Sequence, residues 1–240
     1  MPESKGGGAW LVLPTYNEAE NVEPLVEAVR AKLPPDARVL IVDDSSPDGT
    51  GEIADRLAER HENVAVLHRP RKEGLGPAYI AGFREALAGG AGLVLEMDSD
   101  FSHDPAYLPR LLEEAKRADV VLGSRYVPGG GVSDWGPLRR AISRGGSTYA
   151  RLVLGLDLRD LTGGFKCFRR EVLEAIDLDA ISTRGYAFQV EMTYRAVRLG
   201  FEVVEVPIVF RERRVGSSKM DLGIVAEAVW RLPLLRRYTL

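Results

Sequence analysis

The amino-acid sequence predicts an α/β fold with a mostly parallel central sheet and flanking helices. Three observations support this fold class. Short runs of Val and Leu recur along the first half of the chain, as in strands that are buried on both faces. Segments with a helical spacing of apolar residues separate these runs. The joints between strands and helices are short, which favours right-handed crossovers and parallel pairing.

The predicted strands are short, rich in Val and Leu, and bounded by turn-forming residues. In chain order they span residues 10–13, 38–42, 64–68, 93–97 and 119–123. A late strand is expected within residues 202–210. Because Pro207 has no backbone N–H to donate to a neighbour, this strand is expected at an edge of the sheet.

Helical periodicity alternates with these strands and continues beyond them. The predicted helices span residues 21–33, 51–61, 78–88, 105–117, 138–154, 170–176 and 187–199. Asp104 is a suitable N-cap before Pro105, and Asp48 or Thr50 can cap the second helix. The glycine-rich stretch at 126–137 is too irregular for a helix or strand and is predicted to be a mobile loop.

The composition fits one globular domain in a reducing compartment. The chain has 240 residues, of which 45% are hydrophobic and 28% are charged. Its formal net charge of −3 disfavours a nucleic-acid binder. Cys167 is the only cysteine, so an intrachain disulfide is excluded. Without a signal-peptide pattern or an apolar run of roughly 20 residues, the sequence predicts a cytosolic protein and leaves peripheral membrane contact open.

Polar residues gather where four predicted strands end. The segments are PTYNE at 14–18, DDSSPDGT at 43–50, DSD at 98–100 and GSR at 123–125. Ligands of open α/β sheets bind outside the carboxyl ends of the strands, so these segments are expected to form one site. Turn formation explains one such strand end, because Asp, Ser and Gly are turn residues, but it explains four poorly.

Asp98 and Asp100 are the candidate metal ligands. In extended backbone, side chains two residues apart point to the same side, and paired hard oxygens suit Mg²⁺ or Mn²⁺ that is shared with substrate phosphates. The pair alone is a weak signal, because Asp-x-Asp also occurs in ordinary loops. His61, His68 and His103 are too scattered for a zinc site, and of these His103 is the one expected to touch the Asp-x-Asp segment.

Two common nucleotide-binding motifs do not occur in the sequence. Gly74 and Gly76 begin like a dinucleotide-binding fingerprint, but Tyr79 occupies the third glycine position, and the pair does not follow a predicted strand. The sequence has no P-loop either. A nucleotide at this site must therefore be held by another arrangement.

Seven segments, in this order and spacing, resemble the family-2 glycosyltransferases and, within them, the polyprenol (dolichol) monophosphate mannose synthases. The segments are VLPTYNEAENV, VDDSSPDGT, GLGPAYIAGF, MDSDFSHDP, GSRY, LTGGFKCFRREVL and GYAFQVEM. The combination of SDWGPLRRAISRG, LTGGFKCF and a late RVGSSKM is more specific to this lipid-phosphate branch. The resemblance covers about residues 10–220 and implies a nucleotide-sugar-transferase fold of the GT-A type.

The resemblance implies a donor site for GDP-mannose. Pro14, Tyr16 and Glu18 match the nucleoside pocket, and Val42 and Asp44 match the guanine–ribose contacts. The residues matched to the diphosphate region are Asp98, Asp100, Arg213 and Lys219, and Ser99 is a further donor-binding residue. The two late basic residues are expected to close over the donor diphosphate.

The same resemblance implies a metal site and an acceptor site, with Asp98, Asp100 and Arg125 as the catalytic residues. Asp98 and Asp100 match the family's metal-binding Asp-x-Asp, which bridges the diphosphate to Mg²⁺ or Mn²⁺. Ser102 falls where some relatives have a metal-contacting glutamine, so it is a third candidate ligand that departs from the pattern. The residues matched to the acceptor phosphate are Arg125, Arg139 and Ser143.

The implied reaction is an inverting, metal-dependent transfer of mannose from GDP-mannose to a polyprenyl monophosphate, giving polyprenyl-phosphate-mannose and GDP. A phosphate monoester has a second pKa of about 6 and is already nucleophilic at neutral pH, so no general base is needed. Glu191, where other family-2 enzymes place a base, is therefore expected to have a structural or orienting role. Cys167, Phe165 and Phe168 are expected in the core.

Three alternative functions remain open from the sequence. The first keeps the chemistry but uses UDP-glucose, because the residues that select the sugar are not evident. The second is a non-catalytic module that binds a nucleotide sugar or a lipid phosphate. Retention of five site residues argues against it: Asp98, Asp100, Arg125, Arg139 and Lys219. The third is a nucleotidyltransferase, which would need a Gly- and Lys-rich phosphate loop where PTYNE stands.

The chain divides into a flexible N-terminus at 1–9, a catalytic domain at 10–220 and an amphipathic segment at 221–240. This last segment suits a membrane interface, but it equally fits a helix packed on the core. Because a polyprenyl phosphate lies in a membrane, the resemblance implies a peripheral protein on the cytoplasmic face, with a membrane-anchoring partner protein or domain. Without the family pattern, Arg139 and Arg140 fit a solvated helix face.

Overall fold

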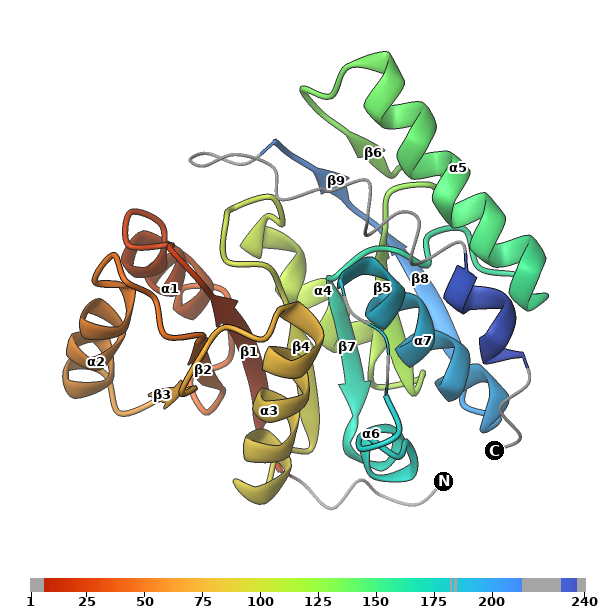
Figure 1. The fold of residues 1–240 in the computed structure, drawn as a ribbon. Coiled ribbons are helices and arrows are strands. Elements are labelled where there is room, and N and C mark those ends of the chain that lie inside the picture. The colour runs from red at the N-terminus through yellow and green to blue at the C-terminus, as the bar shows by residue number, and fades with distance from the viewer. Residues whose placement is uncertain (1–6, 182, 184, 213–229, 237–240) are drawn as a thin grey trace.

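A seven-stranded sheet forms the centre of the molecule (Figure 1). The computed structural model describes residues 7–181, 183, 185–212 and 230–236. The strands lie in the order β3-β2-β1-β4-β7-β5-β8, in which β7 is antiparallel to both neighbours and the other pairs are parallel. This confirms the predicted mostly parallel sheet. The bounds are Ala9–Thr15 (β1), Arg38–Asp43 (β2), Val64–His68 (β3), Leu93–Glu96 (β4), Val120–Ser124 (β5), Lys166–Arg169 (β7) and Val203–Pro207 (β8).

Each predicted helix is present, with shifts at its ends. The helices are α1 (Val22–Arg30), α2 (Thr50–Arg60), α3 (Leu75–Ala88), the 3₁₀ turn η1 (Pro105–Tyr107), α4 (Leu108–Glu114), α5 (Pro137–Leu154), α6 (Arg170–Ala175) and α7 (Gly185–Arg198). Asp104 caps η1 as expected, because its Oδ1 accepts the Ala106 N–H at 2.9 Å. The expected cap of α2 is wrong by one residue. Gly49 is its N-cap with a φ of 89°, and Asp48 accepts the Thr50 N–H from outside the helix.

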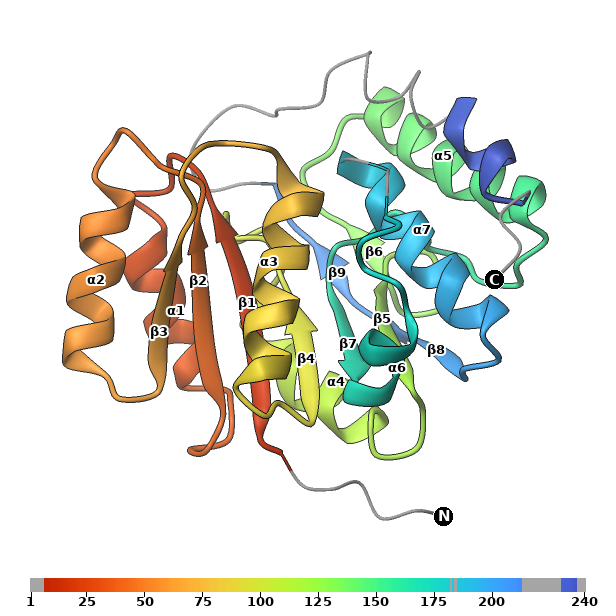
Figure 2. The same cartoon turned by 60° about the horizontal axis from the view of Figure 1, so that its bottom comes forward.

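Apolar side chains alternate between two cores, one on each face of the sheet. Along β1, Leu11 and Leu13 enter one core and Trp10 and Val12 enter the other, because successive strand residues point to opposite faces. Helices α1, α2 and α4 cover the first face. Helices α3, α6 and α7 and the end of α5 cover the second (Figure 2). Burial on both faces explains the unbroken Val and Leu runs.

The strand β7 is a feature that the sequence did not predict. It has only four residues, of which the first, Lys166, and the last, Arg169, are charged. It joins β4 to β5 and places Lys166 directly opposite Glu96. Cys167 and Phe168 of this strand, and Phe165 before it, are fully buried, which confirms their expected place in the core.

A second, two-stranded sheet extends beyond β5. The predicted strand at 202–210 divides into β8, at the edge of the main sheet, and β9 (Val209–Phe210), which pairs with β6 (Gly131–Val132). Pro207 ends β8 at that edge, as its missing N–H predicts. The predicted loop at 126–137 therefore contains a short strand that is paired with a late part of the chain.

Both predicted end segments lie largely outside the described residues. Of the N-terminus at 1–9, the structure describes residues 7–9, and of the amphipathic segment at 221–240 it describes 230–236, which are helical at 230–235. In the described part of the chain, no helix combines the length and the apolar character that crossing a membrane requires.

Candidate active site

The carboxyl ends of the parallel strands meet at one edge of the sheet, as the sequence predicts. The Ser99 hydroxyl donates to the Pro14 carbonyl oxygen at 2.8 Å, which ties the turn after β4 to the end of β1. The Asp44 N–H donates to the Thr15 carbonyl oxygen at 3.0 Å, which ties the end of β2 to β1. Residues 14–18, 43–50 and 98–100 are therefore neighbours in space.

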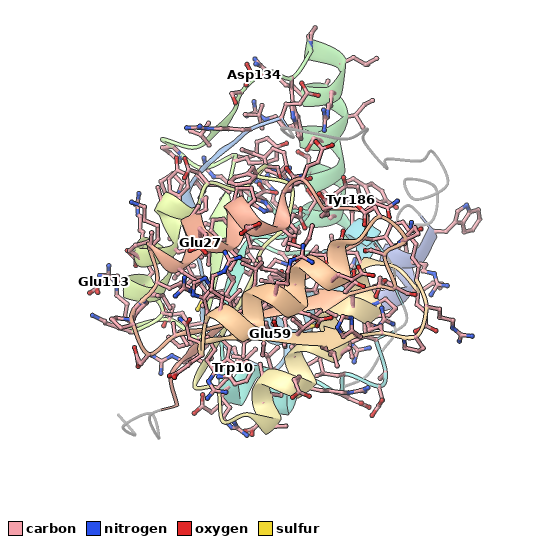
Figure 3. The ribbon with its side chains drawn as sticks, turned by 90° about the vertical axis from the view of Figure 1, so that its left-hand side faces the viewer. Trp10, Glu27, Glu59, Glu113, Asp134 and Tyr186 are labelled. Carbon is pink, nitrogen blue, oxygen red and sulfur yellow. The ribbon has the colours of Figure 1, made fainter. Side chains whose placement is uncertain are left out.

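Strained backbone marks the segments around this edge. Phe101, directly after Asp100, has a φ of 62°, which is unusual for a bulky residue and shows that the surrounding structure holds this turn. Such conformations cost about 1–3 kcal/mol each and cluster at functional sites. Among the described residues other than glycine, those with positive φ are Asn17, Ser45, Phe101 and Asp134. Figure 3 shows Asp134 toward one end of the molecule and Trp10, which lies near the start of β1, toward the other.

Asp98 and Asp100 lie in the turn after β4 and differ in exposure. The Asp98 side chain is 30% exposed, and the Tyr79 hydroxyl donates to its Oδ1 at 3.3 Å. Asp100 is buried, and its Oδ1 accepts the Ser102 N–H at 3.0 Å. The Ser102 hydroxyl is buried and has no hydrogen-bond partner among the described residues. Oxygen atoms of the three predicted metal ligands thus belong to one short turn.

His103 contacts this turn, as the sequence predicts. It is buried against Phe165, with ring centroids 5.1 Å apart, and its Nδ1 accepts the Asp98 N–H at 3.3 Å. Burial lowers the pKa of His103 to about 4, so the imidazole is neutral at pH 7. A neutral ring that accepts a backbone hydrogen bond supports the turn that carries Asp98.

The residues of this turn fit a divalent cation that is shared with a substrate. Within the described ranges, no group of three or more His, Cys, Asp or Glu side chains could hold a metal ion by itself. Mg²⁺ in phosphate chemistry is usually held by one or two carboxylates, and water and phosphate oxygens complete its shell. Asp98 and Asp100 meet this requirement, and the partial exposure of Asp98 leaves room for a ligand.

Asp44 is held by an ion-pair network at the end of β2. It pairs with Arg69, whose Nη2 lies 2.6 Å from Glu73 Oε2. Asp44 Oδ2 also accepts the N–H groups of Glu73 and Gly74, at 3.3 and 3.4 Å. Asp44 therefore anchors the loop before α3. Arg69 belongs to this network, although the sequence analysis did not single it out.

The predicted nucleoside pocket lies beside this network. Tyr16 and Glu18 follow β1 and are half-buried. Lys72 Nζ lies 3.7 Å from the centroid of the Tyr16 ring, a cation–π contact that was not expected from the sequence. Val42 is fully buried within the sheet, where it pairs with Pro14 of β1 and Leu67 of β3.

Arg125 follows β5 and is buried in a bidentate ion pair with Asp160. Its Nε lies 2.6 Å from Asp160 Oδ2, its Nη2 lies 2.7 Å from Oδ1, and Nη2 also donates to Thr162 Oγ1 at 2.8 Å. Burial alone would raise the pKa of Asp160, but the Arg125 charge outweighs it and holds the pKa below its usual range. A phosphate bound by Arg125 must therefore share the guanidinium with Asp160.

Arg139 and Ser143 lie one turn apart on α5. The Arg139 guanidinium carbon lies 4.2 Å from the centroid of the Trp135 ring, and its Nη1 lies 2.8 Å from Glu212 Oε1. Ser143 Oγ accepts the Tyr126 hydroxyl at 2.7 Å. Trp135 is buried, although it lies in the predicted mobile loop, and it gives Arg139 a fixed aromatic surface.

The structure brings the predicted acceptor residues into one group. Trp135 contacts Arg139 and lies 5.9 Å from the Arg125 guanidinium carbon, and Tyr126, which binds Ser143, lies 5.3 Å from it. The sequence analysis gave Tyr79, Trp135 and Asp160 no role in the site. The available signal was their place inside or next to the GLGPAYIAGF, SDWGPLRRAISRG and LTGGFKCF segments. Arg213 and Lys219 lie outside the described residues.

Glu191 on α7 is fully buried and bound on both carboxylate oxygens. Its Oε1 lies 2.7 Å from Arg195 Nη2, and its Oε2 accepts the Thr183 hydroxyl at 2.6 Å. These contacts tie α7 to the segment before it, which fits the predicted structural or orienting role.

Comparison with known proteins identifies the family. The family model described as glycosyl transferase family 2 matches residues 10–177. An undecaprenyl-phosphate mannosyltransferase from Micrococcus luteus is 54% identical over 218 residues, which cover 91% of this chain and 89% of that protein. A polyprenol monophosphomannose synthase from Mycolicibacterium smegmatis is 47% identical over 224 residues, which cover 92% of this chain and 84% of that protein.

Solved structures with low sequence identity share the fold. Glucosyl-3-phosphoglycerate synthase from Mycobacterium tuberculosis, in complex with Mn²⁺, UDP and glucosyl-3-phosphoglycerate, is similar with a TM-score of 0.69 at 19% identity, covering 97% of this chain and 80% of that one. Its complex with Mg²⁺ and UDP gives a TM-score of 0.67 at 21% identity, covering 97% and 79%. At these identities the likeness establishes the fold, in agreement with the predicted GT-A architecture.

Proposed function

Since the chain belongs to glycosyl transferase family 2, we propose that it transfers mannose from GDP-mannose to a polyprenyl monophosphate and releases GDP. The observation that carries this proposal is the identity of 54% and 47% with two enzymes named for mannose and a polyprenyl acceptor. The edge of the sheet adds the chemistry that such a reaction needs. Asp98 and Asp100 offer oxygen ligands, and Arg125 and Arg139 offer phosphate-binding groups.

At the donor end, Asp98 and Asp100 would hold Mg²⁺ or Mn²⁺, which when bound supplies positive charge to the leaving diphosphate. Ser102 is the further candidate for this ligand set. The nucleoside would lie at the ends of β1 and β2, and basic residues after β9 would close over the diphosphate. The proposed donor contacts are Pro14, Tyr16, Glu18, Val42, Asp44, Ser99, Arg213 and Lys219.

At the acceptor end, the polyprenyl phosphate would be held by Arg125, Arg139 and Ser143. The planar guanidinium matches phosphate oxygens in pairs and offsets the repulsion between the acceptor and the diphosphate. One acceptor oxygen forms the new bond to C1 of mannose while the bond from C1 to the diphosphate breaks. This direct displacement converts the α-linked donor into a β-linked product.

The reaction as proposed uses no general base. The phosphate monoester carries no proton that must be removed at neutral pH, because its second pKa is about 6. His103 and Glu191 are otherwise committed: His103 accepts the Asp98 N–H, and Glu191 pairs with Arg195. The proposal therefore assigns catalysis to charge placement and alignment.

An exposed apolar stripe on α5 supports a membrane-bound acceptor. Leu138 is 72% exposed and Leu152 is 70% exposed, and with Ile142 they lie within about 80° of one another around the helix. The helix carries four arginines and no acidic residue. Apolar side chains flanked by cations favour an anionic lipid surface, to which each cation contributes about 1 kcal/mol.

A second exposed apolar group lies next to this stripe. The helical residues 230–235 lie beside α5 in both views, and their buried leucines join the same core cluster (Figures 1 and 2). Trp230 in this helix is 80% exposed. We therefore propose peripheral binding to the cytoplasmic face of a membrane. Residues 10–220 would form the catalytic unit, residues 221–240 would contribute to the membrane interface, and an anchoring partner protein or domain would assist.

The test is transfer of radiolabelled mannose from GDP-mannose into an organic-extractable product, with a short polyprenyl phosphate and Mg²⁺ or Mn²⁺. The expected result is label in the lipid phase that is lost when EDTA is added. UDP-glucose serves as the matched donor control. Transfer from UDP-glucose but not from GDP-mannose would overturn the donor assignment and keep the mechanism. Transfer from neither donor would contradict the proposal and favour a binding module.

A further inference from the structure

A buried polar cluster lies at the end of β4, two residues before Asp98, and has no part in the proposed chemistry. It consists of Glu96 on β4, Lys166 on β7 and Gln189 on α7, each at most 1% exposed. Lys166 Nζ lies 3.3 Å from Glu96 Oε1, donates to the Gln189 main-chain oxygen at 2.9 Å and binds the Gln189 side-chain oxygen. Lys166 thus links strands β4 and β7 to helix α7.

Stability alone does not account for this cluster. A buried ion pair is often replaceable by apolar residues without loss of stability, because desolvation offsets the attraction between the charges. In the described part of the protein, neither the Gln189 Nε2 nor the Glu96 oxygens make a hydrogen bond of good geometry, although Glu96 lies near both Lys166 and Gln189. Incompletely satisfied buried groups cost stability, so their presence points to another role.

The place of the cluster indicates that role. Glu96 and Lys166 are the last residue pair between β4 and β7 before the two strands separate at the site. A Cβ on Gly164 would lie 3.2 Å from Gln189 Nε2 and 3.4 Å from Asp98 Oδ1, so the amide and the carboxylate border the same small space. The glycine keeps that space open.

A second contact connects α7 to the same carboxylate. Phe188, the neighbour of Gln189, stacks on Tyr79 with ring centroids 5.9 Å apart and planes 2° apart. The Tyr79 hydroxyl donates to Asp98 Oδ1. Helix α7 therefore approaches one oxygen of Asp98 through two neighbouring residues.

We propose that Gln189 and Lys166 are positioning residues that orient the Asp98 carboxylate for metal binding, Gln189 from beside it and Lys166 by fixing Gln189. Polar groups that border a metal ligand restrict the orientations it can take, and loss of such a supporting group typically weakens metal affinity by about 10–100-fold. Because this role presupposes the metal site proposed above, the test measures metal binding separately from transfer.

The decisive variant is Gln189→Met, which keeps side-chain length and removes the amide. Mn²⁺ is titrated into the full chain with saturating GDP, and free Mn²⁺ is measured by electron paramagnetic resonance. The expected result is a Kd at least about tenfold higher than in the unsubstituted protein. Thr193→Val is the matched control: Thr193 is buried on the same helix, and its hydroxyl donates to the main-chain oxygen of Gln189 and not to its amide. It should leave the Kd unchanged.

A second variant tests the shared space without touching either polar residue. Gly164 has a φ outside the left-handed region, so Gly164→Ala is allowed by the backbone, and its methyl group should displace Asp98 or Gln189 and weaken Mn²⁺ binding as well. If Gln189→Met bound Mn²⁺ with unchanged affinity while Asp98→Asn lost Mn²⁺ binding, the positioning role would be wrong and the metal site would still stand. If the unsubstituted protein bound no Mn²⁺, the metal role of Asp98 and the positioning role would both be wrong. Equal losses of affinity and Tm in Gln189→Met and Thr193→Val would assign the effect to packing.

Discussion

Asp100 is buried in the turn after β4, and its Oδ1 accepts the Ser102 N–H. Asp100→Asn keeps the shape of the side chain and removes the charge. Because a metal-bound diphosphate depends on that charge, mannose transfer should fall by roughly 100-fold or more. Initial rates at increasing Mn²⁺ measure the effect. Asp104→Asn is the control, since asparagine caps η1 equally well. Near-normal turnover of Asp100→Asn in excess Mn²⁺ would contradict the assignment.

Arg139 gives a prediction that separates the acceptor from the donor. Arg139→Ala removes the cation that stacks on Trp135, so KM for the polyprenyl phosphate should rise about tenfold or more while the Kd of GDP-mannose stays the same. The neighbouring Arg140 is exposed on the same helix, and Arg140→Ala should change neither constant. Loss of GDP-mannose binding in Arg139→Ala, with acceptor use intact, would show that the division of the site is wrong.

The reactivity of the Cys167 thiol tests whether this part of the core is closed to solvent. Burial raises the pKa of Cys167 to about 12, so at pH 8 only about one thiol in ten thousand is ionised. The thiolate is the reactive form, and the side chain is inaccessible as well. Iodoacetamide should therefore label the native protein at pH 8 far more slowly than the urea-unfolded protein. Mass spectrometry with time measures this, and equal rates would contradict a buried Cys167.

At the scale of elements, the exposed apolar side chains of α5 predict that this helix contacts a membrane. The triple variant Leu138→Ser, Ile142→Ser and Leu152→Ser removes the apolar stripe and leaves the buried side of the helix intact. Co-sedimentation with vesicles of anionic lipid should fall several-fold, because less apolar area enters the interface. Leu199→Ser removes an exposed leucine elsewhere and should have no effect. Equal sedimentation of all three proteins would argue against α5 as the contact.

Elements also show where sequence reasoning succeeds and where it fails. The strands around β1 could be predicted because burial on both faces leaves a continuous apolar run, as at Leu11 to Leu13. The strand β7 could not, because Lys166 is buried through its partners Glu96 and Gln189, which lie 70 and 23 residues away. Likewise, Trp135 is fixed by Phe210, which a local pattern cannot reveal.

At the scale of the whole molecule, the edge where the site forms could be predicted, and the detailed network could not. The carboxyl ends of parallel strands meet by topology, so PTYNE, DDSSPDGT and DSD had to be neighbours. The Arg125–Asp160 ion pair forms because the chain after α5 returns to the end of β5, and no periodic sequence pattern predicts that return. Sequence pattern therefore predicts where polar groups gather, and the structure is needed to show which of them are already paired.

That pair also predicts how the stability of the molecule depends on pH. Asp160 binds Arg125 and donates its own N–H to Glu205 Oε1 at 2.9 Å, so it links the end of β5 to β8. Asp160→Asn leaves a buried cation without its counter-charge and should lower the free energy of unfolding at pH 7 by about 3 kcal/mol. Urea unfolding measures this. The control is Asp119→Asn. Asp119 Oδ1 lies 4.0 Å from Arg169 Nε in a partly exposed ion pair, so this substitution should lower the free energy of unfolding by less than about 1 kcal/mol.

The pH dependence of this difference follows from the lowered pKa of Asp160. A carboxyl group whose pKa is lower in the folded state stabilises the protein fully above its ordinary value of about 3.9, and this stabilisation is lost as the pH falls toward the folded value. The unsubstituted protein should therefore keep its advantage over Asp160→Asn from pH 7 down to about pH 5, and the advantage should shrink below pH 4. The advantage disappears because the unfolded carboxyl binds a proton that the folded ion pair excludes. A difference that stayed constant into acid would mean that the charge of Asp160 does not hold Arg125 in place.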